Sequence, residues 1–133
     1  MVMDIKIIKD YLINEVPEIS NIPFFIDNIP DGIKECFVIG LNSVLEDTDL
    51  RTNIIIEIIY KNSIENKTKK QCYDIFDYVY LKLRQRGSFK INNDINVIYI
   101  NAYGYPFDKI DKDKKLVYIN SLFNIAYNDR KYP

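Results

Sequence analysis

The 133-residue chain has no histidine and no tryptophan, only four glycines and only two cysteines. Without histidine, a Ser-His or Cys-His nucleophile pair cannot form, and zinc loses its commonest nitrogen ligand. Cys36 and Cys72 lie in apolar stretches without a CxxC spacing, so we interpret both as reduced core thiols. The glycines are isolated, which excludes a glycine-rich phosphate loop. We therefore predict a protein that is not an enzyme and that needs no metal or cofactor.

Long apolar runs are also missing. No stretch approaches 18 uninterrupted apolar residues, and Asp4, Lys6 and Lys9 interrupt the N-terminal segment where a signal peptide would be apolar. We expect no membrane association, and synthesis in the cytoplasm. Hydrophobic residues make up 47% and charged residues 28%, which are ordinary globular values, so residues 1–133 should form one domain.

The net charge of −1 is unevenly distributed along the chain. Residues 1–50 hold 10 acidic and 3 basic side chains, a net charge of −7, whereas residues 61–90 hold 8 basic and 3 acidic side chains, a net charge of +5. A chain with one acidic and one basic region is suited to contacts between its own copies.

Hydrophobic periodicity and breaker residues predict an α+β fold: a mostly antiparallel central sheet of about four strands, with an N-terminal helix and one long helix packed on it. Asn62 should cap the long helix and Gly87 should end it. Between the first helix and the first strand, three prolines predict an irregular arm or covering loop. The expected elements are a helix at 4–15, the arm at 17–32, a strand at 35–41, an acidic hairpin loop at 45–51, a strand at 52–62, a helix at 64–86, a strand at 95–103 and a strand at 116–127.

The stretch from Asp108 to Lys115 holds three acids and four lysines. Its Asp-x-x-Asp-x-Asp spacing resembles part of a calcium loop, but no glycine makes the sharp turn, no glutamate closes the cage, and the lysines repel a cation. We interpret it as a solvated turn between antiparallel strands.

Two other chemistries have weak support in the sequence. Glu57 and Lys61 resemble a metal-dependent nuclease core, but they are four residues apart on one strand, where that core needs two. Basic segments and eleven tyrosines would suit nucleic acid, yet the pI of about 5.5 is far from a basic footprint. We expect no sequence-specific nucleic-acid binding.

The element order resembles a phage tail terminator, the family that includes minor capsid or head–tail joining proteins. The resemblance covers nearly the whole chain and rests on the N-terminal helix IKIIKDYLINEVP, the strand RTNIIIEIIYKN, the helix KKQCYDIFDYVYLKL and the end GYPFDKIDKDKKLVYINSLFNIAYN. Arg51 and Pro106 are the individual positions that match, both in structural roles. The lysine run 112–115 departs from the family, where an arginine is expected near the turn.

This resemblance implies a structural virion protein, made in the bacterial host cytoplasm, that forms a hexameric ring on the head-proximal end of a phage or phage-like tail tube. The ring would end tube growth and present a surface for joining the head. Its partners would be other copies of itself, the tail tube protein, a head-completion or connector protein and, in a contractile tail, the sheath protein, with DNA passing through the ring.

A ring needs two unlike faces that meet between neighbours. The acidic loop and the basic start of the long helix are candidates for these faces, and the arm is a third candidate. The candidate interface residues are Phe24, Phe25, Glu46, Asp47, Asp49, Lys67, Lys69 and Lys70. The alternatives are another neck or tail-completion protein, a small cytosolic enzyme such as a degenerate nuclease, and an adaptor or regulator.

Overall fold

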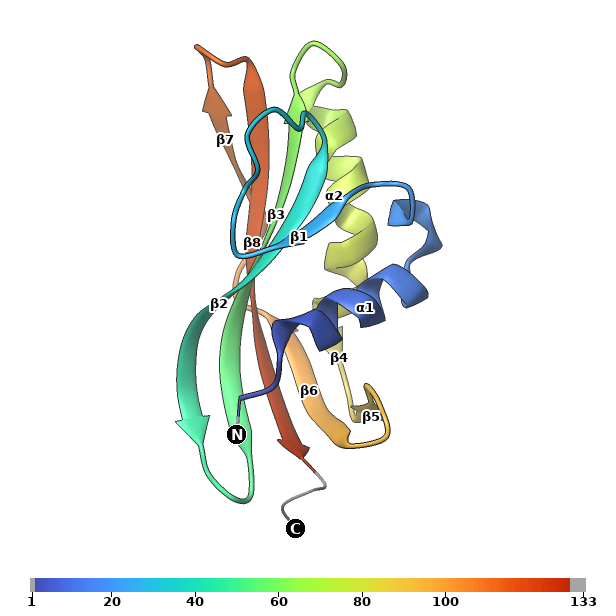
Figure 1. The fold of residues 1–133 in the computed structure, drawn as a ribbon, viewed down its shortest axis with the longest axis vertical. Helices are drawn as coiled ribbons and strands as arrows, with labels where there is room; N and C mark the ends of the chain where they lie inside the picture. Colours follow the sequence, from blue (N-terminus) through green and yellow to red (C-terminus); the bar gives the residue numbers. More distant parts are fainter. Residues whose placement is uncertain (1, 130–133) are drawn as a thin grey trace.

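The computed structural model describes residues 2–129 of the chain (Figure 1). Two helices lie on one side of a long twisted sheet, so the α+β class is confirmed. The elements in chain order are α1 (Ile5–Glu15), the 3₁₀ helix η1 (Pro17–Ile19), β1 (Phe24–Ile26), β2 (Cys36–Asp47), β3 (Thr52–Ser63), α2 (Lys69–Leu83), β4 (Gln85–Arg86), β5 (Phe89–Lys90), β6 (Ile95–Ala102), β7 (Phe107–Asp111) and β8 (Leu116–Asp129).

The sheet has eight strands, in the order β1-β2-β3-β8-β6-β4, with β5 paired to β6 and β7 paired to β8. It is mixed, because β1 runs parallel to β2 while neighbours such as β2, β3 and β8 pair antiparallel. The prediction of a mostly antiparallel sheet of about four strands was therefore wrong. Of the extra strands, β1, β4 and β5 have only two or three residues, which leaves no visible period in a sequence, and β7 has five residues in the charged stretch that was interpreted as a turn.

The core lies between the sheet and the two helices. On β3, Ile54, Ile56, Ile58 and Tyr60 are all fully buried, as the alternating pattern predicted. Phe123 of β8 lies directly opposite Ile56 in the register and is buried on the same side. The two central strands thus provide the continuous apolar surface that both helices cover.

Helix α1 confirms the prediction at its two ends. The carboxylate of Asp4 accepts a hydrogen bond from the backbone N–H of Lys6 at 3.0 Å, which caps the first turn. Pro17 follows the last turn and cannot continue the helix. Ile8 and Leu12, one turn apart, are buried against the sheet.

Helix α2 is shorter than predicted at both ends. Thr68 caps it, with its hydroxyl accepting from the Gln71 N–H at 3.2 Å while the Gln71 side chain accepts from the Thr68 N–H at 2.9 Å. Asn62 was the wrong cap, because it belongs to β3 and is buried. Gly87 does not end the helix either, since the chain leaves it at Arg84 and enters β4 directly.

The arm at 17–32 is more regular than predicted, because it contains η1 and β1. After β1 the chain crosses to the other face of the sheet, where the Pro30 carbonyl accepts a hydrogen bond from the buried Lys61 ammonium at 3.1 Å. Gly32 has a φ of +80°, a conformation that suits glycine in this covering loop. The loop covers part of the sheet face that the helices leave open.

The charged stretch is only partly the turn that the sequence predicted. Its first half is β7, in which Asp108 accepts a hydrogen bond from the Tyr73 hydroxyl of α2 at 2.7 Å. The turn itself is confined to residues 112–115, where the Asp111 carboxylate accepts from the Lys114 N–H at 3.1 Å. Pairing to β8 explains the extra strand, since Ile110 lies opposite the buried Val117.

Candidate interaction surface

The charged residues predicted to mediate assembly lie at opposite ends of β3. The strand begins at Thr52, next to the β2–β3 turn, and ends at Ser63, just before the segment that leads into α2. Its 12 residues span about 36 Å at the usual rise of a strand. Figure 1 shows the β2–β3 turn and the β3–α2 segment at the two ends of the long axis. The two charged regions therefore do not meet within one subunit.

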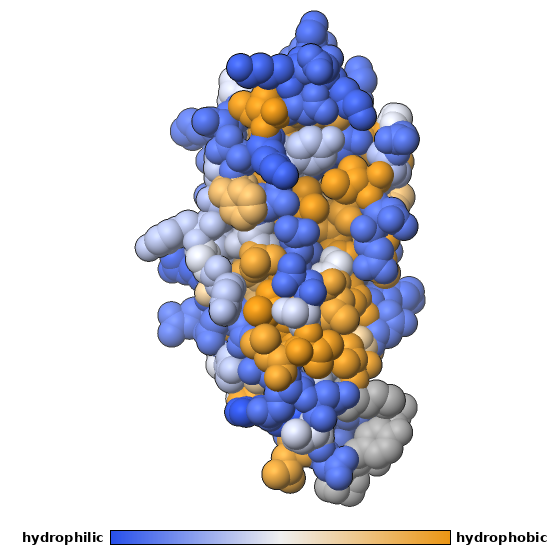
Figure 2. Space-filling view, turned by 90° about the vertical axis from the view of Figure 1, so that its left-hand side faces the viewer, coloured by the Kyte–Doolittle hydropathy of each residue, from blue (hydrophilic) through white to orange (hydrophobic). Residues whose placement is uncertain are grey.

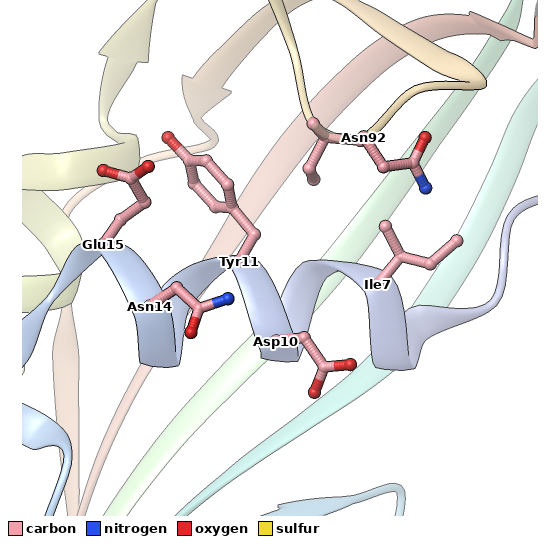
Figure 3. A pocket seen from close by; sticks show the side chains of 7 residues that line it. Ile7, Asp10, Tyr11, Asn14, Glu15 and Asn92 are labelled. Atoms are coloured by element: carbon pink, nitrogen blue, oxygen red, sulfur yellow. The ribbon is translucent and has the colours of Figure 1, made fainter.

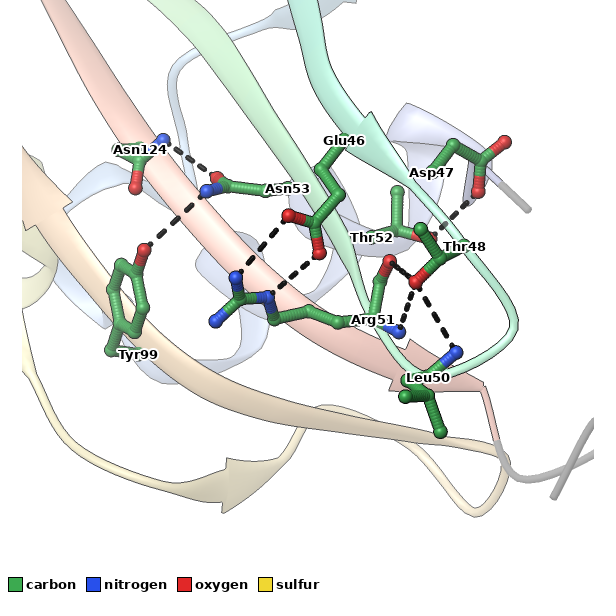
Figure 4. A network of polar contacts seen from close by, with 9 residues as sticks. All are labelled: Glu46, Asp47, Thr48, Leu50, Arg51, Thr52, Asn53, Tyr99 and Asn124. Atoms are coloured by element: carbon green, nitrogen blue, oxygen red, sulfur yellow. Dashed lines mark hydrogen bonds and ion pairs between the residues drawn. The ribbon is translucent and has the colours of Figure 1, made fainter.

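We call residues 46–51 the acidic hairpin (Figure 4). Glu46 and Asp47 belong to β2 and only Asp49 lies in the turn, which corrects the prediction of an acidic loop at 45–51. Arg51 donates to the two oxygens of Glu46 at 3.1 and 3.3 Å, a fork geometry that fixes both side chains across the hairpin. Arg51 therefore has a structural role within the hairpin.

Thr48 holds the turn of the acidic hairpin in one shape. Its hydroxyl accepts hydrogen bonds from the backbone N–H groups of Leu50 and Arg51 at 3.3 and 3.1 Å. On the other side of the hairpin, Thr52 donates to Asp47 at 2.9 Å. Leu50 is 83% exposed at the tip. A rigid tip with an exposed apolar side chain is suited to contact another protein surface.

We call the opposite extremity the basic end: Lys67, Lys69 and Lys70 before and within the first turn of α2, and Lys112, Lys114 and Lys115 in the β7–β8 turn. Residues 64–70 and 112–115 contain these six lysines and only two acids, Glu65 and Asp113. Lys115 binds Glu65 at 2.9 Å, and this bond, followed by Coulomb attraction, lowers the pKa of Glu65. The basic end keeps a net positive charge, while the acidic hairpin has three acids and one arginine.

Besides Lys115, two further lysines of the basic end are paired within the subunit. Lys70 contacts Asp74 at 3.1 Å along the helix, and Lys69 approaches Asp108 of β7 at 3.9 Å. Their side chains are 85% and 56% exposed, so both charges are largely solvated. They remain accessible to a partner.

Phe24 does not lie on the surface. It is 7% exposed, and its ring stacks on Phe37 of β2 with the centroids 5.4 Å apart. This side chain stabilises the edge of the subunit's own core and is not a surface anchor. Phe25 is half-buried on the same strand.

The side of the sheet that faces away from the helices is also partly apolar. Figure 2 views the molecule from that side and shows a band of apolar side chains along its middle, broken by polar residues. Ile55, Glu57 and Ile59 of β3 alternate with the core-facing residues, and Tyr118 and Leu122 of β8 lie on the same face. The alternation on β3 indicated this second, partly covered face from the sequence, and Ile55 on it is only 6% exposed.

The free part of β2 adds to the exposed apolar surface. Strand β1 pairs only with Phe37–Ile39, so the outer edge of β2 beyond Ile39 is not covered by β1. Leu41, Val44 and Leu45 in this part are 42%, 45% and 55% exposed. Exposed apolar residues on a strand edge are typical of a contact surface.

A hollow of about 310 Å³ lies between α1 and the loop before β6 (Figure 3). Asp10 and Glu15 are on its rim, where they pair with Lys6 and Lys82 at 3.4 and 3.5 Å. The Tyr11 ring packs against the Phe89 ring in a tilted arrangement, with the centroids 5.2 Å apart. In Figure 3, Asp10 points away from Asn92, so the polar groups of this hollow do not converge on one point. We assign no reaction to it.

Within residues 2–129, no group of three or more His, Cys, Asp or Glu side chains is arranged to hold a metal ion. In the same range, none of the helices has the length and apolar character needed to cross a membrane. No family model matches the chain, and no curated protein matches it.

Proposed function

We propose that this chain is a structural subunit that closes into a ring, in which the acidic hairpin of one copy contacts the basic end of the next. The observation that supports this most is the placement of these unlike charges at the two ends of β3. A contact between different faces of identical subunits is heterologous, and it closes a ring when the rotation between neighbours divides a full turn. Opposite charge fixes the orientation of each subunit relative to the next.

In line with the tail-terminator resemblance, we place this ring, as a hexamer, on the head-proximal end of a phage or phage-like tail tube. There it ends tube growth and provides the surface that joins the head. The partners are the tail tube protein, a head-completion or connector protein and, in a contractile tail, the sheath protein. The uncovered apolar face and the free edge of β2 supply further surface for these contacts. The protein acts in the virion and has no enzymatic role.

A charge-swap experiment tests the ring contact. Reversing Glu46, Asp47 and Asp49 to lysine should weaken assembly, and reversing Lys67, Lys69 and Lys70 to glutamate should weaken it similarly. Because every interface combines one acidic hairpin with one basic end, a chain with both sets of reversals should assemble again. Sedimentation velocity at low salt measures each variant, and circular dichroism verifies the fold.

Two matched variants make this experiment specific. Asp49→Lys alone leaves the Glu46–Arg51 and Asp47–Thr52 bonds in place, so it changes the charge of the tip without loosening the hairpin. Glu18→Lys changes an exposed charge in η1, away from both ends, and should assemble normally. Normal assembly of both triple reversals would refute the contact. Tails of normal length, joined to heads, in phage carrying them would refute the placement on the tube.

A further inference from the structure

A second hollow, with a volume of about 300 Å³, lies between the C-terminal end of α2 and the connection from β6 to β7. We call residues 103–106 of that connection the aromatic loop. Strand β6 ends opposite Phe123 and β7 begins opposite Asn120, so the aromatic loop lies between the level of the acidic hairpin and that of the basic end. The residues that line the hollow are Tyr80, Arg84, Gln85, Ala102, Gly104 and Tyr105.

The two sides of this hollow are joined by hydrogen bonds. The backbone N–H of Ala102 donates to the Arg84 carbonyl at 2.7 Å, and the Tyr80 hydroxyl donates to the Gly104 carbonyl at 3.3 Å. Gly104 has a φ of +119°, which a residue with a side chain rarely adopts. The end of α2 and the aromatic loop are therefore held in place before any partner binds.

The aromatic loop presents side chains that the subunit does not cover. Tyr105 is 89% exposed and Tyr103 is 62% exposed. Leu81, three residues before Arg84 on α2, is 56% exposed. Tyrosine and arginine are enriched among the residues that dominate binding energy, and a tyrosine loses little conformational freedom on binding. This combination of side chains beside a hollow is typical of a protein contact surface.

Arg84 is the only cation that lines the hollow, and no acidic residue lines it. The other two arginines within residues 2–129 are engaged, Arg51 with Glu46 and Arg86 over the Phe89 ring at 4.0 Å. Arg84 is exposed, and its side chain has no acidic partner in the same range. A guanidinium binds a carboxylate with two parallel hydrogen bonds, so Arg84 is suited to receive one from outside the subunit.

We propose that this hollow binds an acidic segment of a different protein, with a carboxylate on the Arg84 guanidinium and an adjoining aliphatic side chain against the Tyr105 ring. A carboxylate fits better than a phosphate, because the hollow has one cation and lies at the carbonyl end of α2, where a second negative charge is disfavoured. The choice of a different protein rests on the proposed ring, since there the acidic hairpin of each copy already contacts a basic end.

The first experiment tests the chemistry of the hollow. The full chain is titrated at constant salt into a fluorescein-labelled Leu-Asp-Leu-Asp peptide, and fluorescence anisotropy measures binding. Saturable binding is expected for this peptide and not for its Leu-Asn-Leu-Asn counterpart. Arg84→Gln should weaken binding about tenfold, because it removes a charged donor. Tyr105→Ala should also weaken it about tenfold, because it removes the aromatic wall.

Lys90→Gln is the matched control, because Lys90 is exposed on β5 outside the hollow and its loss should leave binding unchanged. Arg84 and Tyr105 are both exposed, so neither variant should lower the thermal midpoint, which separates lost binding from lost folding. Equal binding of the two peptides, or equal weakening by Arg84→Gln and Lys90→Gln, overturns the proposal. Tighter binding of the same peptide with phosphoserine in place of aspartate overturns the choice of a carboxylate.

The second experiment tests whether the occupant is a different protein. Arg84→Gln and Tyr105→Ala should assemble like the parent chain in sedimentation velocity, whereas the triple reversals at the two charged ends should not. If Arg84→Gln and Tyr105→Ala weaken assembly, the hollow is a contact between copies, and the assignment to a different protein is overturned. If the parent chain does not assemble at any salt concentration, the proposed ring fails, and the peptide titration still decides what the hollow binds.

Discussion

The hydroxyl of Tyr60, fully buried on β3, donates a hydrogen bond to the carboxylate of Glu35 at the entrance to β2. Asn62 joins the same group, donating to Glu35 at 3.1 Å and to the Tyr60 oxygen at 2.8 Å. Two side chains of β3 and one from the residue before β2 thus satisfy one another's hydrogen-bonding groups beside the core. This cluster fixes the end of the sheet from which the basic end extends.

Replacing Tyr60 by phenylalanine should destabilise the subunit by about 1–2 kcal/mol, because the hydroxyl is lost while Glu35 and Asn62 stay in place. Urea unfolding measures the change. Tyr78→Phe is the matched control, since Tyr78 is 47% exposed on α2 and its substitution should change the free energy of unfolding by less than about 0.5 kcal/mol. Equal stability of both variants would show that the cluster does not stabilise the fold.

The same tyrosine predicts a pH dependence. Burial, followed by the hydrogen bond to Glu35, raises the pKa of Tyr60 above its ordinary value. Above about pH 10 the unfolded chain ionises this tyrosine while the folded chain keeps it protonated, so folding stability falls as the pH rises. Other buried tyrosines contribute to this fall. The loss of stability between pH 9 and 11 should therefore be smaller in Tyr60→Phe than in the parent chain, and equal losses would contradict the buried hydroxyl.

Phe76 provides the test of the core. It is fully buried on α2, with its ring centroid 6.4 Å from that of Phe37, and Phe76→Ala should cost about 3–5 kcal/mol. The control is Lys69→Ala on the exposed side of the same helix, where the ion pair to Asp108 is long and solvated. Its effect should stay within about 0.5 kcal/mol. A Phe76→Ala chain as stable as the parent would contradict the observed helix face.

The elements that the sequence predicted well are those in which the hydrophobic period of a strand or helix repeats several times. Strand β3 alternates in sequence from Ile54 to Tyr60, and its core-facing residues Ile54, Ile56, Ile58 and Tyr60 are all fully buried. Helix α1 has both a periodic apolar face and clear end signals at Asp4 and Pro17. In these segments local propensity and burial favour the same structure, so a single sequence is informative.

The missed elements are those decided by distant partners. Strand β1 is three residues long and exists because it pairs with β2, while β4 exists because it pairs with β6. Asparagine often caps helices, but the hydrogen bonds of Asn62 to Glu35 and Tyr60 hold this residue in the sheet. A hollow of about 340 Å³ on the sheet face opposite the helices was missed for the same reason, since its walls come from the loop after β1, from β3 and from the β7–β8 hairpin.

The true cap of α2 can be tested separately. Thr68→Ala removes the side-chain oxygen that accepts from Gln71, and should cost about 1 kcal/mol. Thr68→Ser retains a hydroxyl at the same position and should keep most of the stability. The free energy of unfolding of the two variants is compared in urea. If the two variants were equally destabilised, the methyl group and not the cap would be the stabilising feature.

The charged stretch from Asp108 to Lys115 should not respond to divalent cations. Asp108 accepts from Tyr73 and lies near Lys69, whereas Asp111 accepts from the Lys114 N–H, so two of the three carboxylates already have donors within the subunit. The nearby lysines repel a cation, and no glutamate closes a coordination shell. Adding calcium or magnesium at millimolar concentration should leave the thermal midpoint unchanged, with EDTA-treated protein as the control. A bound ion would raise the midpoint with increasing concentration, as linkage requires, and that result would assign this stretch a metal site.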